Sequence, residues 1–441
     1  MKTVKYMIGI TASLALVSCL DTDPETAISS EGVIVDETTA ETVLVGAYSA
    51  TQSFTGSTIS LFNQASDNVV TFYAMGTVIP TPSAASFSGS YSSYYSAINV
   101  INQLVADIPT VSDAKFTGKS KNTKLAESLF LRALAYFDLA ISYGGVPLVL
   151  EPSTSSHSAD GIRRSSYEET LAQVESDLDR AEELFDGNLP TRARASLWAV
   201  YALKARLYLF QQKWDQAEQY ASKLIDSKFF ALTPEVKDWY ENSLSSTSIF
   251  ELVFSTADQN PIYTNSLPAD LGGRLDYVPQ GDLVQLLLDE NIGGKRSQLI
   301  ARQNAYSDQY VVQQFGKTDG SSSLVVFRLE EQYLIRAEAR AQQGKLALAV
   351  EAINVIRNRA AVAPVDAETL SRQDILLVIE NERRLELAFD GHRYKDIIRT
   401  GRAPEVFGAY NEAYKDPNYW VLPFPYSAIT ADPDLEQNPG Y

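Results

Sequence analysis

The chain has 441 residues, with 37 lysines and arginines against 55 aspartates and glutamates, giving a formal net charge of −18 at pH 7. This acidic excess repels phosphate backbones and anionic headgroups, and it argues against nucleic acid as a partner. A chain of this length usually forms two or more domains, unless it is a repeat scaffold that grows by stacking.

The N-terminus predicts export and attachment to lipid. Lys2 and Lys5 precede an apolar run that ends at Val17, which is too short to cross a bilayer of roughly 30 Å and is typical of a signal peptide over residues 1–18. The last residues of this segment resemble a bacterial lipobox and lead to Cys19, the single cysteine of the chain. We expect the Cys19 thiol to carry lipid, palmitate included. The alternative is an ordinary signal peptide with a chance cysteine at its cleavage site.

Residues 19–35 are polar and acidic, and we interpret them as a lipidated tether. Acids directly after the cysteine also resemble the surface-export signal of lipoproteins in the Bacteroidetes. No later stretch of the sequence is long and apolar enough to span a membrane, so residues 36–441 are expected to be a body held by one lipid anchor.

The body is predicted to be mostly α-helical. A helix near 122–143 carries apolar side chains at steps of three and four, and we expect it to pair with a helix over 166–185. Two further stretches, at about 194–227 and 328–360, share one spacing of aromatic, small and aliphatic residues: Tyr201, Ala205, Ala217, Ala221 and Leu224 in the first, and Tyr333, Ala337, Ala349, Ile353 and Ile356 in the second. Small residues on two consecutive helices let the pair approach closely, as in tetratricopeptide repeats. The alternative is two unrelated amphipathic hairpins.

Two segments, at about 54–95 and 229–326, have a different composition, with many Ser, Thr, Asn, Gly and Tyr residues. Insertions into a repeat scaffold tend to fall on one face, which is often the binding face. We therefore expect a ligand site in these loop-rich segments.

The sequence offers no pattern for catalysis. No second His or Cys stands at metal-ligand spacing from His157 or His392. A Gly-x-Ser-x-Gly elbow and a Gly-rich phosphate loop are both missing from the sequence. We therefore expect a protein that is not an enzyme, with no catalytic residue, metal or cofactor.

One group of acids could suggest acid–base chemistry: Glu380, Glu382 and Glu386. Arg383 and Arg384 stand between them at helical spacing, so we expect an ion-pair ladder along one helix and a structural role.

Three stretches resemble the SusD/RagB family of Bacteroidetes outer-membrane nutrient-binding lipoproteins. They are YSSYYSAINVIN at 91–102, ENERRLELAFDGHRYKDIIRTG at 380–401, and the ending LPFPYSAITADPDLEQNPGY at 422–441. The resemblance implies a scaffold of about four tetratricopeptide-like helix pairs, over about 122–227 and 328–400, with an irregular, loop-rich ligand-binding region on its other face. It also implies that the protein is a lid on a SusC-like TonB-dependent outer-membrane barrel. As such a lid, it would capture glycans or, in the RagB branch, peptides.

In glycan binders of this family, aromatic rings cover the C–H faces of sugars, and amides and carboxylates bind the hydroxyls. The four tryptophans, Trp198, Trp214, Trp239 and Trp420, are each expected in the core, so the stacking is assigned to tyrosines: Tyr73, Tyr91, Tyr263 and Tyr277. Asp67 and Asn68 match an acidic–amide stretch of the family and are expected to bind ligand, with Arg274 as a further donor.

The family stretches themselves are expected to be structural. Asn102 should bond backbone within its own helix turn, Asp390-Gly391 should form a turn, and Arg393 and Arg399 should tie helix ends to loops.

Two alternatives keep the predicted architecture and change the function. One is capture of peptides, which the acidic charge and the lack of tryptophan platforms keep open. The other is an envelope scaffold whose helix pairs bind only protein.

Overall fold

The computed structural model describes residues 32–71, 85–153, 161–187, 191–304, 308–432 and 434–441. Cys19, Tyr73 and His157 lie outside these residues, as do the predicted signal peptide and most of the predicted tether. Among the described residues, no helix is both long enough and apolar enough to cross a membrane.

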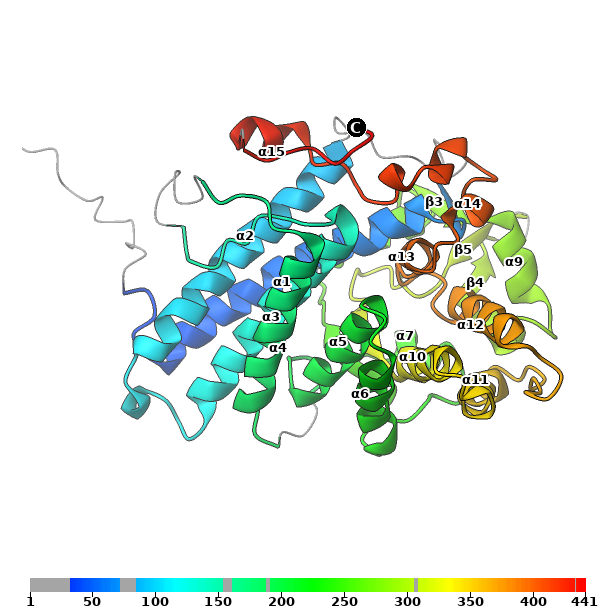
Figure 1. Cartoon of the computed structure of the whole chain (residues 1–441), viewed down its shortest axis with the longest axis horizontal. Coiled ribbons are helices and arrows are strands. Elements are labelled where there is room, and N and C mark those ends of the chain that lie inside the picture. Colours follow the sequence, from blue (N-terminus) through cyan, green and yellow to red (C-terminus); the bar gives the residue numbers. More distant parts are fainter. Residues whose placement is uncertain (1–31, 72–84, 154–160, 188–190, 305–307, 433) are drawn as a thin grey trace, which may run out of the picture.

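Four long helices make up the N-terminal part of the fold, on the left of Figure 1: α1 (Glu37–Ala65), α2 (Ala85–Asp107), α3 (Ser120–Tyr143) and α4 (Tyr167–Leu184). A capping box begins α1, where the Thr39 N–H donates to the Asp36 carboxylate at 2.9 Å, and another begins α4 at Ser166. Most of α3 is buried between its neighbours. The helix predicted near 122–143 and its partner over 166–185 are therefore confirmed.

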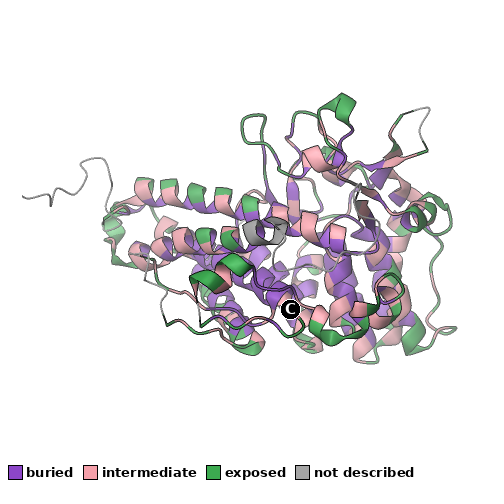
Figure 2. Ribbon diagram, turned by 90° about the horizontal axis from the view of Figure 1, so that it is seen from above, coloured by how far each residue is buried: buried purple, intermediate pink, exposed green. Residues whose placement is uncertain are grey.

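The helices predicted from the repeated spacing are also present. They are α5 (Leu197–Phe210) with α6 (Trp214–Asp226), and α10 (Leu329–Gln342) with α11 (Leu346–Arg359), followed by α12 (Arg372–Glu386) and α13 (Arg393–Arg399). Ala205, Ala217, Ala337 and Ala349 are fully buried, because each stands where two helices approach closely. Figure 2 shows the buried residues on the inner faces of the helices and the exposed residues on their outer edges. This packing agrees with the tetratricopeptide-like interpretation.

Short strands and helices connect the long helices. Antiparallel pairs join β1 (Val69–Thr71) to β3 (Tyr277–Pro279), β2 (Ser248–Leu252) to β6 (Leu324–Arg328), and β4 (Ile300–Arg302) to β5 (Tyr310–Val312). The short α-helices are α7 (Asp238–Glu241), α8 (Tyr263–Ser266), α9 (Gly281–Leu288), α14 (Ala403–Val406) and α15 (Tyr426–Ala431). Within the described residues the 3-10 helices are η1 (Ile108–Thr110), η2 (Asp113–Lys115), η3 (Ala269–Leu271), η4 (Gly294–Leu299), η5 (Glu412–Lys415) and η6 (Pro417–Tyr419). The β1–β3 pair joins the two segments predicted to be loop-rich, 54–95 and 229–326, which are far apart in the sequence. For the first segment that prediction is wrong over residues 54–65 and 85–95, which belong to α1 and α2.

Asn102 does not bond within its own helix turn, and that prediction is wrong. Its amide donates to the carbonyls of Val149, at 2.8 Å, and Glu151, at 3.2 Å, in the loop after α3. Its oxygen accepts from Arg132 Nη1 at 3.0 Å, and Arg132 also binds Asp177 of α4. Asn102 therefore holds the segment directly after α3, around Val149 and Glu151, against α2.

The turn after α12 forms as predicted. Asp390 and Gly391 lie in it, and Gly391 has φ 74°, a left-handed conformation that favours glycine. A Cβ at Gly391 would lie 3.1 Å from the Cα of Ile59 on α1. The Asn63 amide of α1 donates to the carbonyl of Phe389 at 2.7 Å, so α1 is hydrogen-bonded to this turn.

The acids of α12 have a structural role, but the predicted ladder along one helix is wrong. Arg383 donates to Asp396 on α13 at 2.7 Å, and Arg384 donates to Asp282 on α9 at 2.9 Å. Glu382 and Glu386 are buried at 2% and 1% exposure and bind arginines of other elements. A buried carboxylate requires a cation on its own side of the helix, and the neighbouring arginines project elsewhere.

Glu386 is the centre of this buried cluster. It pairs with Arg296 of η4 at 2.8 Å, with Arg328 at the end of β6 at 3.2 Å, and with Arg359 of α11. Burial by itself raises the pKa of the Glu386 carboxyl, but the three guanidiniums outweigh burial and lower that pKa far below its ordinary value. The carboxylate is therefore charged at any physiological pH.

We predict that Glu386→Gln lowers the free energy of unfolding by about 3–5 kcal/mol, because it leaves buried guanidiniums without their shared anion. Urea unfolding of the full chain, followed by circular dichroism, measures this. The matched control is Glu412→Gln, since that side chain is 90% exposed beside Lys415, and it should change stability by less than about 0.5 kcal/mol. Equal effects of the two substitutions would contradict the central role of Glu386.

Candidate functional site

Asp67 and Asn68 lie buried just before β1, at 5% and 0% exposure. Both oxygens of the Asp67 carboxylate accept from Arg393, at 2.8 and 2.9 Å. Asn68 donates to the carbonyl of Ala388 at 2.8 Å and accepts from Arg384 Nε at 2.9 Å. In this structure the two side chains attach the start of β1 to the turn after α12, and they would have to leave these partners in order to touch a ligand.

The charge of Asp67 depends on this pairing. Burial by itself raises the pKa of the Asp67 carboxyl, but the hydrogen bonds and charge of Arg393, together with the charge of Arg384, hold the pKa below its ordinary value. Arg393, predicted to tie a helix end to a loop, does so through this pair.

Three other predicted residues come together around α8 and β3. The Arg274 N–H donates to the carbonyl of Thr264 at 2.6 Å, which fastens the segment before β3 to α8. The backbone of Tyr277 pairs with Thr71 of β1. Tyr263 begins α8, and its hydroxyl contacts Gln259 at 3.2 Å. The β1–β3 ladder thus brings the loop-rich segments into one region.

Arg274 is the exposed cation of this region. Its side chain is 64% exposed, and it donates to Asp276 at 2.8 Å and to the Asn265 amide oxygen at 2.6 Å. Arg274 directly follows Gly273, where the backbone packs closely against Leu267. A Cβ on Gly273 would lie 2.0 Å from the carbonyl oxygen of Leu267, so this position requires glycine. Guanidinium, amide and carboxylate groups therefore stand together on a surface loop, where they can bind hydroxyl groups.

Tyr91 lies elsewhere, against a cavity of about 570 Å³ that we call the tyrosine pocket. The pocket is lined by Tyr91, Tyr95 and Asn99 of α2, by the loop after α3, and by Ala428 and Asp432 near α15. The Tyr91 ring is 7% exposed, and burial raises the pKa of its hydroxyl to about 12. Tyr91 therefore lines this pocket, apart from the other predicted residues.

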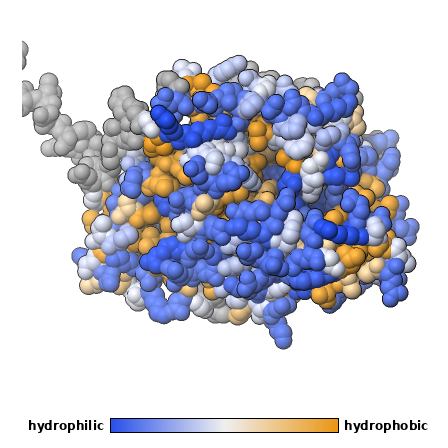
Figure 3. All heavy atoms as spheres, in the orientation of Figure 1, coloured by the Kyte–Doolittle hydropathy of each residue, from blue (hydrophilic) through white to orange (hydrophobic). Residues whose placement is uncertain are grey.

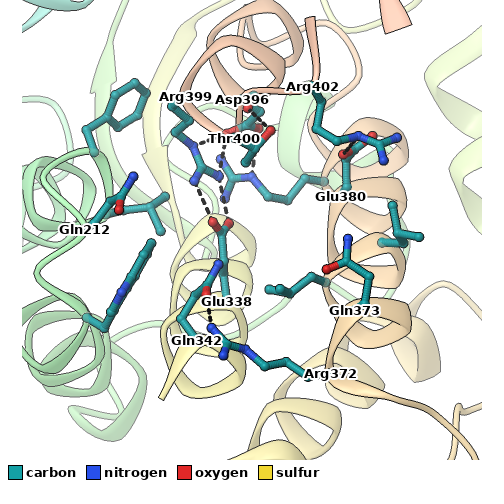
Figure 4. Close-up of a pocket in the computed structure, with 16 residues that line it drawn as sticks. Gln212, Glu338, Gln342, Arg372, Gln373, Glu380, Asp396, Arg399, Thr400 and Arg402 are labelled. Carbon is teal, nitrogen blue, oxygen red and sulfur yellow. Dashed lines mark hydrogen bonds and ion pairs between the residues drawn. The ribbon is translucent and has the colours of Figure 1, made fainter. Parts of the chain in front are cut away.

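A second cavity, of about 670 Å³, opens between the helix pairs, and we call it the helix-pair pocket (Figure 4). Its lining comes from five helices and their turns: Leu209, Phe210, Gln212, Trp214, Glu338, Gln342, Arg372, Gln373, Leu376, Leu377, Glu380, Arg383, Asp396, Arg399, Thr400 and Arg402. None of the predicted ligand residues is among them. The expectation that all four tryptophans are core residues holds for buried Trp239, whereas Trp214 lines this pocket and Trp198 and Trp420 are only partly buried.

Ion pairs form the floor of the helix-pair pocket. Arg399 binds both oxygens of Glu338, at 2.6 and 2.7 Å, and also binds Asp396 at 2.9 Å. Arg399 was predicted to tie a helix end to a loop, but it connects α13 to α10. Sequence reasoning missed the pocket because its lining is scattered over five helices.

The part of the chain that the structure describes contains no group of three His, Cys, Asp or Glu residues placed to hold a metal ion. The face in Figure 3 is mostly hydrophilic, with separate apolar patches. The side chains around Arg274, in the tyrosine pocket and in the helix-pair pocket can form hydrogen bonds, stack on rings and pair with charges.

Comparisons with known proteins connect these features. Residues 235–441 match the SusD_RagB model, described as the SusD family, and residues 19–209 match a model described as "Starch-binding associating with outer membrane". The SusD-like protein P38 of Formosa agariphila is 25% identical over 423 aligned residues, 82% of this chain and 81% of that protein. The SusD-like protein P2 of the same organism is 22% identical and is covered over its whole length, with 99% of this chain aligned.

Solved structures share the fold. A laminarin-binding SusD-like protein superposes with a TM-score of 0.79 at 23% identity, over 92% of this chain and 100% of its own. A SusD superfamily protein from Bacteroides vulgatus gives a TM-score of 0.81 at 18% identity, over 92% of this chain and 99% of that one. The mostly helical architecture predicted from the sequence is confirmed.

We predict that Asp67→Asn destabilises the chain by about 3–5 kcal/mol at pH 7, because it removes the buried anion that Arg393 and Arg384 share. The folded pKa of Asp67 is lowered, so the stabilisation is present above the unfolded pKa and is lost as the pH falls through the folded pKa. Urea unfolding at pH 7 and again below pH 3 should show the difference between wild type and variant shrinking. Asp270→Asn, at an exposed acid of η3, is the control; a difference at Asp67 that did not change with pH would contradict the account.

Proposed function

This chain belongs to the SusD/RagB family, and from that premise we propose that it is a lipid-anchored outer-membrane protein that captures a nutrient glycan and delivers it to a SusC-like TonB-dependent transporter. In this proposal it binds its ligand without transforming it, and Cys19 carries the anchor. The family description, with its starch binding and outer-membrane association, supports both the ligand class and the location. The name of the laminarin-binding relative also supports a glycan ligand.

The observation that carries the proposal is the pairing of β1 with β3. The two loop-rich segments, at 54–95 and 229–326, were selected from composition alone, and the structure joins them at Thr71 and Tyr277. We define the glycan face as Tyr263, Arg274 and the backbone of Tyr277 in β3. Tyr73, also predicted to stack on a sugar, lies outside the described residues. The Tyr263 ring would cover the C–H face of a sugar, and Arg274 would donate to its hydroxyl groups.

Asp67 and Asn68 take a different role in this proposal. Their side chains are buried and paired, so we propose that they position β1 beneath the glycan face and do not touch the sugar. Tyr91 would contribute through the tyrosine pocket, where serine hydroxyls, Asn99 and Asp432 line the wall near its ring. An oligosaccharide held at one of these places needs no metal and no cofactor.

We predict that replacing Tyr263 and Arg274 together by alanine weakens oligosaccharide binding at least about tenfold. A stacked aromatic ring contributes on the order of 1 kcal/mol, and a hydrogen bond from a charged donor contributes about 1.5–3 kcal/mol. Isothermal calorimetry of the full chain in detergent, against a panel of oligosaccharides, measures the effect.

The matched control is the pair Tyr426→Ala and Arg180→Ala, since both side chains are more than half exposed and lie outside the glycan face. If no oligosaccharide of the panel gives heat of binding, the proposal of glycan capture is contradicted. Copurified peptides found by mass spectrometry would favour the peptide alternative instead.

The anchor has its own test. With Cys19→Ala, metabolic labelling with palmitate should vanish and glycan uptake by cells should fall, while the purified chain keeps its affinity for glycan. The affinity is unchanged because the lipid holds the protein beside its transporter and takes no part in the glycan face. Labelling that survives the substitution would show that lipid is attached elsewhere.

A further inference from the structure

The helix-pair pocket is an unassigned cavity with the dimensions of a ligand site. Its volume of about 670 Å³ falls within the range of roughly 300–1,000 Å³ that is typical of small-molecule sites. The floor and walls come from α10, α12 and α13, together with the turn between α5 and α6. Rigid helices therefore shape it, which suits a preformed site.

The carboxylates of the pocket are already bound to arginines. Glu338 is bound by Arg399, and Asp396 by Arg383 and Arg399. Glu380 is shared between Arg402 and Arg393. These acids therefore have little capacity left to attract a cationic ligand.

Two arginines of the pocket, by contrast, have donors to spare. At the rim, Arg372 donates to the neutral amide of Gln342, and among the described residues no carboxylate lies within ion-pair distance of it (Figure 4). In the floor, Arg383 is 3% exposed, and its Nη1 has no hydrogen-bond partner within the described chain. A buried donor without a partner is costly, and an oxygen ligand would relieve that cost.

The N-terminus of α12 adds to this positive potential. Arg372 is the first residue of the helix, directly after the cap Ser371, where the backbone N–H groups favour an anion. The nearby acid, Asp374, accepts from the Ser371 N–H at 3.0 Å as part of the capping box. A locally cationic pocket on a chain of net charge −18 indicates an anionic ligand.

The other walls fit a sugar. Trp214 and Phe210 offer aromatic surface, beside Leu376 and Leu377. The amides of Gln212 and Gln373 can both donate and accept, as sugar hydroxyls do. Gln342 accepts from Arg372 and keeps its amide N–H groups, and Thr400 donates to the carbonyl of Asp396 at 2.8 Å and keeps its oxygen as an acceptor. A planar carboxylate is an anion that an arginine binds with two parallel hydrogen bonds.

We propose that the helix-pair pocket is a second binding site, separate from the glycan face, for a carboxylate-bearing sugar such as a uronic acid. The sugar ring lies against Trp214, and its carboxylate is bound by Arg372. The choice of a saccharide rests on the proposed function, whereas the choice of an anion rests on the arginines of the pocket.

The test is calorimetry of the full chain in detergent with trigalacturonate, and with the neutral trisaccharide galactotriose as the comparison. The acidic sugar should bind, and its affinity should fall as salt is added. Arg372→Gln should weaken it about tenfold or more, and Trp214→Ala should weaken it severalfold. Because Arg372 is exposed, its substitution should leave the thermal unfolding midpoint unchanged.

Arg180→Gln is the matched control, because it removes the same charge from an exposed position on α4 that lies outside the pocket. The variant with Tyr263 and Arg274 both changed to alanine should bind trigalacturonate normally, which separates this site from the glycan face. Absence of binding, equal losses in Arg372→Gln and Arg180→Gln, or loss in the glycan-face variant would overturn the proposal. A glutamate-rich peptide that bound the pocket as tightly as the sugar would also overturn it.

Discussion

Glu386, buried at the end of α12, is the point on which the fold depends. Its carboxylate is shared by arginines from η4, β6 and α11, so one side chain joins the loop-rich insertion to two helices of the scaffold. Burying these charges has a large desolvation cost, which only this dense mutual pairing offsets. The turn that follows α12 then receives Asn63 and Asn68 from the α1 end of the chain, so the position of β1 depends on the same helix.

Helices could be predicted from the sequence because their periodicity is local. Steps of three and four gave α3, and the recurring small residues gave α5–α6 and α10–α11, since only small side chains fit at close helix crossings. Ion-pair partners could not be predicted in this way. The acids of α12 have arginine neighbours at suitable spacing, yet their partners stand many residues away, and only the tertiary fold decides which cation shares a buried side of the helix.

The candidate site was likewise predictable only in part from the sequence. Composition marked the two loop-rich segments, and the β1–β3 pairing brought them together. The burial of Asp67 and Asn68 could not be predicted from the sequence. Two polar residues before a strand can face solvent or, as here, an arginine of α13, and the sequence does not distinguish the two cases. The helix-pair pocket was invisible for a stronger reason: each helix contributes only a few lining residues, and no single stretch carries a binding pattern.

The proposed function requires that a glycan binds where β1 and β3 meet. A crystal structure of the chain with a tightly binding oligosaccharide from the panel would locate the sugar. We expect sugar density against Tyr263 and Arg274, with Asp67 still paired to Arg393 beneath it. Density for that oligosaccharide only at another surface, with the glycan face empty, would show that the glycan binds elsewhere.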